Sequence, residues 1–144
     1  MDIQELKVGN VVAAKRKRID DGVEVREPIK IRSIGSNSGQ VPAEQVYTWV
    51  IDTNGTIHDS KDLDPIDLTV NMMKRFRFKS DALTQTMTMY TERLSVVYDR
   101  TDNTLTILKH RRPIFENYVD YVHELQNVLS LFDITINVTT EKVK

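Results

Sequence analysis

The sequence predicts an α+β protein with a curled N-terminal β-sheet, followed by a small antiparallel sheet packed against a C-terminal amphipathic helix. Short β-branched and aromatic runs alternate with tight-turn signals over residues 1–66. Strict alternation of apolar residues returns after residue 84, and apolar residues then recur at helical spacing over residues 117–132. We therefore expect two lobes, a β lobe over 1–66 and an α+β lobe over 67–144.

Two hairpin signals organise the first lobe. Asp20-Asp21-Gly22 separates strands expected at 11–19 and 23–34, because glycine adopts positive φ at little cost. The run 46–51 has the strongest strand character, and Asn54-Gly55 marks a second hairpin. Pro28 indicates an edge or a bulge, since proline cannot donate to a strand ladder. Strands at this spacing are typical of a small SH3-like curled sheet or barrel, which we expect for residues 1–66.

The second lobe begins after Pro65. Thr69 is expected to cap a short amphipathic helix, and residues 84–90, 94–98 and 104–108 read as three strands. Pro113 is expected to end the preceding element. The clearest helical pattern spans about 117–132, with its apolar stripe on the sheet, and 134–138 is a candidate last strand.

Composition excludes several functional classes. The chain has 144 residues, a formal net charge of −1 and no cysteine, which excludes a disulfide scaffold, a cysteine-bound metal cluster and a thiol nucleophile. It contains no Gly-x-Ser-x-Gly and no glycine-rich loop that opens a helix. We expect neither catalysis nor a cofactor. Without an apolar run long enough for a membrane span, we expect the protein in the cytoplasm of a host cell or in a virion.

Basic side chains over the first predicted hairpin form a candidate binding patch for nucleic acid or for a partner. They are Lys15, Arg16, Lys17, Arg18, Arg26, Lys30 and Arg32. Such a patch contacts phosphates with salt-dependent affinity, or it protects an edge strand from pairing with another chain. Because alternate side chains of a strand point to opposite faces, only two of the four consecutive cations can share one face.

A second candidate set serves contact between the lobes or with a ligand. It comprises His110, Arg111, Arg112, His123, Gln126 and Asn127. His123-Glu124 begins like a zinc-protease helix, but the second histidine is replaced by Asn127, so no metal site is predicted. We expect a polar seam where the helix meets the sheet or the first lobe, with ligand contact as the alternative.

Tyr47 and Trp49 are separated by one residue in the strongest predicted strand. If both point the same way, one face of that strand is aromatic and offers a recognition surface. The alternative is a core position for Trp49, which is common for tryptophan in a strong strand.

Three ordered blocks resemble small uncharacterised proteins of Bacteroidota and their phages and prophages. Leu6-Lys7-Val8-Gly9-Asn10-Val11-Val12 is similar to that family's L-R-x-G-N-x-V. The segment Pro65–Phe78 is similar to its P-I-x-L-T … L-x-K-F-G-F, with Arg77 in place of glycine. Tyr121–Asn127 is similar to its Y-V-H-x-L-Q-N, and 131–133 departs from the L-T-G that follows. The resemblance implies a phage-type accessory protein and assigns no catalytic residue.

Together these observations predict a non-catalytic, protein-binding module. It would be virion-associated or act on host takeover or host defence, with a phage or host protein or a second copy of the chain as partner. Nucleic-acid binding through the first basic patch is the alternative, and a small-nucleotide pocket near His123 and Arg111 is a third hypothesis. No membrane partner is expected.

Overall fold

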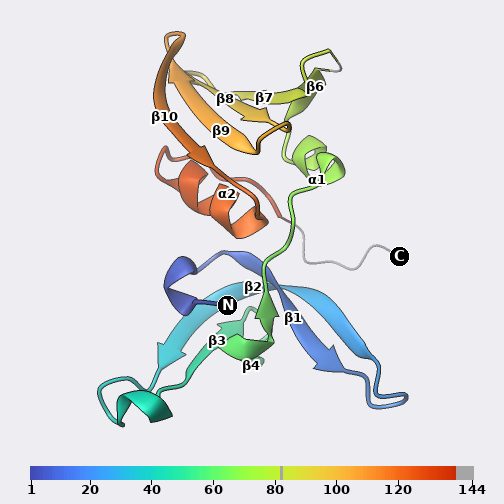
Figure 1. Cartoon of the computed structure of the whole chain (residues 1–144), viewed down its shortest axis with the longest axis vertical. Helices are drawn as coiled ribbons and strands as arrows, with labels where there is room; N and C mark the ends of the chain where they lie inside the picture. The colour runs from blue at the N-terminus through green and yellow to red at the C-terminus, as the bar shows by residue number, and fades with distance from the viewer. Residues whose placement is uncertain (82, 139–144) are drawn as a thin grey trace. The chain divides into compact units, whose positions relative to one another are not determined.

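The computed structural model describes residues 1–81 and 83–138 and confirms the α+β class (Figure 1). The chain divides into two compact units. The first unit combines Met1–Ile66 with the described residues from Val122 onward, and the second is Asp67–Tyr121.

The first unit contains a five-stranded antiparallel sheet in the order β4-β3-β2-β1-β5. Its strands are β1 (Val11–Lys17), β2 (Glu24–Ser36), β3 (Thr48–Asp52), β4 (Ile57–Asp59) and β5 (Leu63–Asp64), with single-turn 3₁₀ helices at Ile3–Glu5 (η1), Ala43–Gln45 (η2) and Ser60–Asp62 (η3). Both predicted hairpins form, and Gly22 and Gly55 have positive φ angles of 69° and 85°. The strand order and curled sheet are compatible with the SH3-like fold.

Strand β2 runs unbroken through Pro28, which sits opposite Ala13 of β1. Strand β3 pairs only with the later part of β2, from Ile31 onward, so the free side of β2 at Pro28 needs no backbone donor. The register shift lies instead between Ile31 and Ser33. The proline is thus at a local edge, and the bulge falls farther along the strand.

One face of this sheet encloses the core of the first unit. Its members are Leu6, Val12, Ala14, Ile29, Ile31, Val50 and Leu63. Because side chains alternate along a strand, the neighbours of Val12 and Val50 point to the opposite face.

Helix α2 (Val122–Ser130) is shorter than predicted and belongs to the first unit, whereas we expected it in the second lobe. Its start was predicted five residues too early, because Arg112–Tyr118 forms strand β10 instead. Pro113 is tolerated there because β10 is the edge strand of its sheet. The buried stripe of the helix contains Val122, Leu125 and Leu129 as expected, but the expected strand at 134–138 does not form.

The second unit holds another five-stranded antiparallel sheet, in the order β10-β9-β8-β7-β6. The three predicted strands are β7 (Thr86–Tyr90), β8 (Leu94–Asp99) and β9 (Thr104–Lys109), and β6 (Lys79–Asp81) and β10 extend the sheet on either side. Helix α1 (Val70–Arg75) begins where Thr69 accepts a hydrogen bond from the Met72 amide at 3.2 Å, as predicted.

Helix α1 ends in a turn that glycine would favour, although the residue there is Arg77. Its φ is 75°, its amide donates to the Lys74 carbonyl, and the Phe78 amide donates to the Met73 carbonyl at 3.0 Å. These two bonds define a Schellman motif, whose left-handed residue is usually glycine. Met73 and Phe78 are both buried and supply its usual apolar contact. Arg77 therefore occupies the left-handed position that glycine usually takes at the end of a helix.

Candidate binding surfaces

Four of the seven cations in the basic patch of the first hairpin are paired with carboxylates, and two of them share one carboxylate. Lys15 and Arg26 lie 3.7 and 2.7 Å from the two Asp64 oxygens. Arg16 pairs with Glu27, and Arg18 lies 2.6 Å from Asp21. The strand register also places these cations on two faces of the sheet. Lys15 points to the same face as Arg26, its partner on β2, whereas Arg16 points to the same face as the core residue Ala14. Most of this predicted patch is thus a set of ion pairs on two faces.

Three cations of that patch, Lys17, Lys30 and Arg32, are exposed and have no ion pair with any residue that the structure describes. They do not form one cluster. Lys30 is opposite Val11, which is six residues along β1 from Lys17, or about 20 Å at the rise of an extended strand. The unpaired cations offer scattered contacts rather than one concentrated positive surface.

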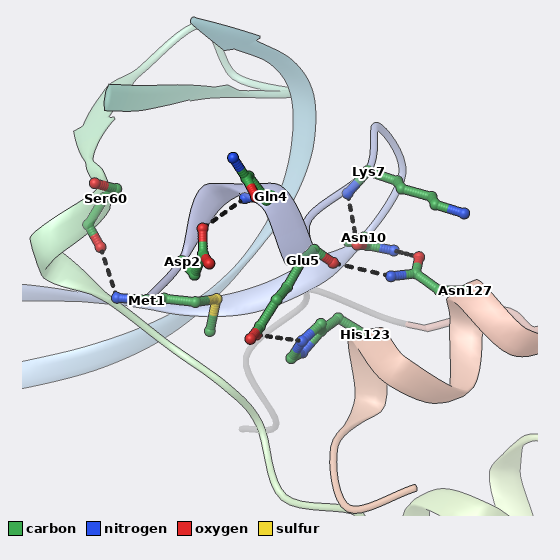
Figure 2. A network of polar contacts seen from close by, with 9 residues as sticks. All are labelled: Met1, Asp2, Gln4, Glu5, Lys7, Asn10, Ser60, His123 and Asn127. Atoms are coloured by element: carbon green, nitrogen blue, oxygen red, sulfur yellow. Dashed lines mark hydrogen bonds and ion pairs between the residues drawn. The ribbon is translucent and has the colours of Figure 1, made fainter. Parts of the chain in front are cut away.

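Side-chain amides of α2 hold the N-terminal segment of the first unit (Figure 2). The Asn10 side-chain nitrogen donates to the Asn127 oxygen at 2.8 Å, and the Asn127 nitrogen donates to the Glu5 carbonyl at 3.0 Å. Asn10 also accepts from the Lys7 amide at 2.8 Å. These groups connect segments that are far apart in the sequence.

Gln126 completes this amide seam, which we define as Asn10, Gln126 and Asn127. Its oxygen accepts from the Val11 amide at 2.9 Å, and its nitrogen donates to the Gly9 carbonyl at 3.1 Å. A hollow of about 170 Å³ adjoins the seam. Because the seam amides bind one another and the backbone, their hydrogen-bonding capacity serves the fold, which weighs against a ligand site there.

His123 lies on the same helix and is 1% exposed. Its Nε2 is 3.8 Å from a Glu5 carboxylate oxygen (Figure 2). Burial lowers the pKa of His123 below its ordinary value, and the nearby charges of Glu124 and Glu5 oppose this effect only in part. The neutral imidazole is therefore the favoured form inside the unit.

The β3–β4 hairpin contains a His–Asp pair that sequence reasoning missed. Asp52 accepts hydrogen bonds from His58 Nε2 at 2.8 Å and from the amides of Asn54 and Thr56. Burial raises the pKa of Asp52, but these hydrogen bonds lower it by more, so the net shift is downward. A polar hollow of about 310 Å³ lies beside the pair, lined also by Arg16, Glu27 and Lys30. The pair closes the hairpin. The sequence feature that could have indicated it is Asp52, which stands three residues before the turn glycine Gly55.

Tyr47 and Trp49 are neighbours, with ring centroids 5.1 Å apart and an interplanar angle of 34°. Trp49 is not in the core, because Val50 of the same strand points into it. Its indole crosses Gly35 on the adjacent strand, where a Cβ atom would come within 2.2 Å of the ring. Only a residue without a side chain leaves room for this ring position.

Two isoleucines extend the aromatic pair on the face of β3 and β4 opposite the Val50 core. Ile51 lies two residues from Trp49 on the same face, and Ile57 of β4 is directly opposite Ile51. Tyr47 is 46% and Ile57 62% exposed. We name Tyr47, Trp49, Ile51 and Ile57 the aromatic face. The isoleucines were missed because their pairing depends on the register of β3 and β4.

The predicted residues His110, Arg111 and Arg112 are at the hairpin between β9 and β10. Lys109 and Arg112 are paired, so His110 and Arg111 form a two-residue turn, and their φ angles are 52° and 65°. Positive φ at both central residues is the geometry of a type I′ turn, which favours Asn-Gly. All three residues are exposed.

None of the known proteins, protein families or solved structures with which we compared the chain matches it. Over residues 1–81 and 83–138 no group of three histidine, aspartate or glutamate side chains is placed to bind a metal ion. In that same part of the chain, neither α-helix has the length and apolarity that a membrane crossing requires.

Proposed function

We propose that this chain is a non-catalytic binding module that docks on another protein through the aromatic face of its first unit. The observation that carries the proposal is the Tyr47–Trp49 pair on the side of the sheet opposite the Val50 core. Aromatic side chains supply most of the binding energy in many interfaces, since they bring large contact areas with few rotatable bonds.

The aromatic face is held in place before a partner arrives. The Asn37 side chain accepts from the Tyr47 amide at 2.6 Å and donates to the Gln45 carbonyl at 3.3 Å, and its own amide donates to the Tyr47 carbonyl. Gly35 fixes the position of the Trp49 ring by close approach. Pre-organisation of this kind lowers the entropic cost of binding.

The partner that fits is an extended peptide segment with apolar side chains and a basic residue. Asp59 is directly opposite Trp49, and Glu44 lies in the exposed η2 turn just before the aromatic pair. Carboxylates at the rim of an apolar face favour a cation on the partner. The SH3-like character of the unit adds support, because SH3 domains bind extended proline-rich segments on aromatic surfaces.

We further propose that the module is a phage or prophage accessory protein, on the basis of the three sequence blocks described above. A virion component and an inhibitor of host defence both agree with a binding role. Mass spectrometry of purified particles separates these roles, because only a virion component copurifies with the particles.

A peptide library displayed on phage tests the proposed docking face. We expect the full chain to enrich apolar peptides with a basic residue, and the Ile57→Asp variant to lose their binding at least tenfold. The matched control is Ile19→Asp, because Ile19 is 101% exposed in the other hairpin of the same unit. Peptides that bind Ile57→Asp as tightly as Ile19→Asp, or a failure to enrich any sequence, would reject the proposal.

A further inference from the structure

Strand β4 is an outer strand of the first sheet, and its backbone has a free edge. The turn before it is closed by two hydrogen bonds of 2.9 Å, from the Asp52 amide to the Thr56 carbonyl and from the Gly55 amide to the Asp52 carbonyl. In an antiparallel ladder, hydrogen-bonded and non-hydrogen-bonded pairs alternate. Ile57 follows Thr56 and therefore forms a non-hydrogen-bonded pair with Ile51. The N–H and C=O of Ile57 thus point away from β3, toward the free edge.

The same alternation gives the direction of the Asp59 amide. His58 and Val50 form the next pair, which is hydrogen-bonded, and Asp59 and Trp49 form the one after it, which is not. The Asp59 N–H therefore also points to the free edge. In the part of the chain that the structure describes, no hydrogen bond satisfies this N–H or the N–H and C=O of Ile57. Their spacing of two residues is the one that an added strand requires.

The other edge strands have features that protect them from pairing with a further strand. Strand β10 contains Pro113 and a register shift, β6 begins with Lys79, and β5 has only two residues. Proline, lysine, bulges and short length are the means by which sheet edges avoid pairing with another chain. Strand β4 has three residues and carries no proline, lysine or bulge. Its edge is therefore open to an added strand.

Side chains hold β4 in place at both of its ends. At one end the buried Asp52 carboxylate accepts a hydrogen bond from His58 Nε2 at 2.8 Å. At the other end the hydroxyls of Thr48 and Ser60 are hydrogen-bonded at 2.5 Å, and Ser60 is also buried. A short edge strand fixed in this way keeps the extended conformation that an added strand needs, which lowers the entropic cost of binding.

An added strand would continue the rows of the aromatic face. Its residue opposite Ile57 extends the row of Ile51 and Ile57, and the residue two positions away extends the row of Trp49 and Asp59. An apolar side chain suits the first position, because Ile57 is 62% exposed. A cation suits the second, because the Asp59 carboxylate has no ion pair with a described residue. A second copy of β4 would bring no cation.

From these observations we propose that the partner segment binds as an added β-strand on the free edge of β4. Its orientation is antiparallel, the slightly more stable pairing, with a basic residue two positions before an apolar one. This inference rests on the docking proposed for the aromatic face and specifies its geometry. Strand addition takes affinity from main-chain hydrogen bonds and specificity from alternate side chains. A proline-rich segment lacks the N–H groups for such a ladder, so the two ways of docking are distinguishable.

N-methylation of the most enriched display peptide tests the ladder with the full, unchanged chain. Fluorescence anisotropy should show binding weakened about tenfold when the apolar residue opposite Ile57 is N-methylated, because its N–H points at β4. The matched control is N-methylation of the preceding residue, whose N–H points away, and it should change affinity by less than about twofold. Equal effects at the two positions would overturn strand addition and leave the docking face standing. A failure to enrich any peptide would reject both.

Two variants of Asp59 separate its N–H from its charge. Asp59 has a φ of −67°, which proline also adopts. Asp59→Pro removes the N–H and the carboxylate, whereas Asp59→Asn removes only the charge, so Asp59→Pro should bind the peptide about fivefold more weakly than Asp59→Asn. Equal affinities of the two variants would contradict the proposal.

Hydrogen exchange of the unchanged chain, followed by NMR, gives a measurement that needs no variant. The amides of Ile57 and Asp59 should exchange more slowly when the peptide is bound, because they enter a ladder. The His58 amide already belongs to the ladder with β3 and should change less. Protection that is absent from Ile57 and Asp59 would overturn strand addition.

Discussion

Asn10 and Asn127 are 117 positions apart in the chain, and their side-chain amides lie 2.8 Å apart. Asn10 is 3% exposed, and Asn127 also holds the Glu5 carbonyl. This pair, together with Gln126, attaches α2 to the segment that leads into β1. A side-chain hydrogen bond between buried groups contributes modestly when made, but leaving one partner unsatisfied is costly. The seam is therefore a determinant of the fold of the first unit.

Asn127→Ala should destabilise the protein by about 1–3 kcal/mol, because the buried Asn10 side chain loses its acceptor and the Glu5 carbonyl, at an exposed contact, loses a donor. Urea unfolding followed by circular dichroism measures the change. Ser130→Ala is the control, since the Ser130 hydroxyl donates to the Asn127 carbonyl of its own helix. A loss no larger than that of the control would show that the seam contributes little.

Arg77→Gly should stabilise the protein by about 1 kcal/mol, because Arg77 has a φ of 75° at the left-handed position of the Schellman motif. Lys74→Gly, three residues earlier inside α1, should have the opposite sign and cost about as much. Thermal unfolding of both variants measures the two shifts. Destabilisation by Arg77→Gly would mean that the arginine side chain contributes more than its backbone strain costs.

Stability should decrease as the pH falls below about 6.5, because His123 has a lowered pKa in the folded state. In the window between the folded and the unfolded pKa, the unfolded chain binds more protons, so acid favours unfolding. His123→Gln cannot take up a proton and should flatten this dependence relative to the unchanged chain. Urea midpoints at pH 7.5 and 5.5 are the measurement, and an unchanged slope in His123→Gln would contradict the prediction.

The sequence was informative where a pattern is local. Turn residues located the hairpins at Gly22 and Gly55, and alternation located β7 to β9. It failed at β10, because Pro113 normally breaks a strand and an edge position cannot be recognised before the strand order is known. Long-range partners were equally hidden. Neither the approach of Asp64 to Lys15 and Arg26, nor the attachment of α2 to the first unit, follows from spacing along the chain.

The candidate surfaces show the same limit. Tyr47 and Trp49 were recognised as a possible face because they alternate in one strand, but their isoleucine neighbours required the register of β3 and β4. The run from Lys15 to Arg18 was the strongest charge signal in the sequence, yet carboxylates neutralise three of its four cations. Charge in a sequence predicts a positive surface only where the fold brings no acidic partner beside it.

Gly35→Ala should displace the Trp49 ring, because the added methyl group would come within 2.2 Å of it. The ring cannot yield into the sheet, since Gly35 is its direct partner across the strands, so we expect it to rotate outward and lose its contact with Tyr47. Trp49 is the single tryptophan of the chain, and its fluorescence therefore reports this movement alone. Emission should shift to longer wavelength, and peptides selected on the aromatic face should bind at least tenfold more weakly, corresponding to about 1.4 kcal/mol.

Ser33→Ala, on the same face of β2, is the control for a small change nearby. If Gly35→Ala leaves the emission and peptide affinity as they are in Ser33→Ala, the indole is not held by this close approach, and the pre-organisation assigned to the aromatic face is wrong.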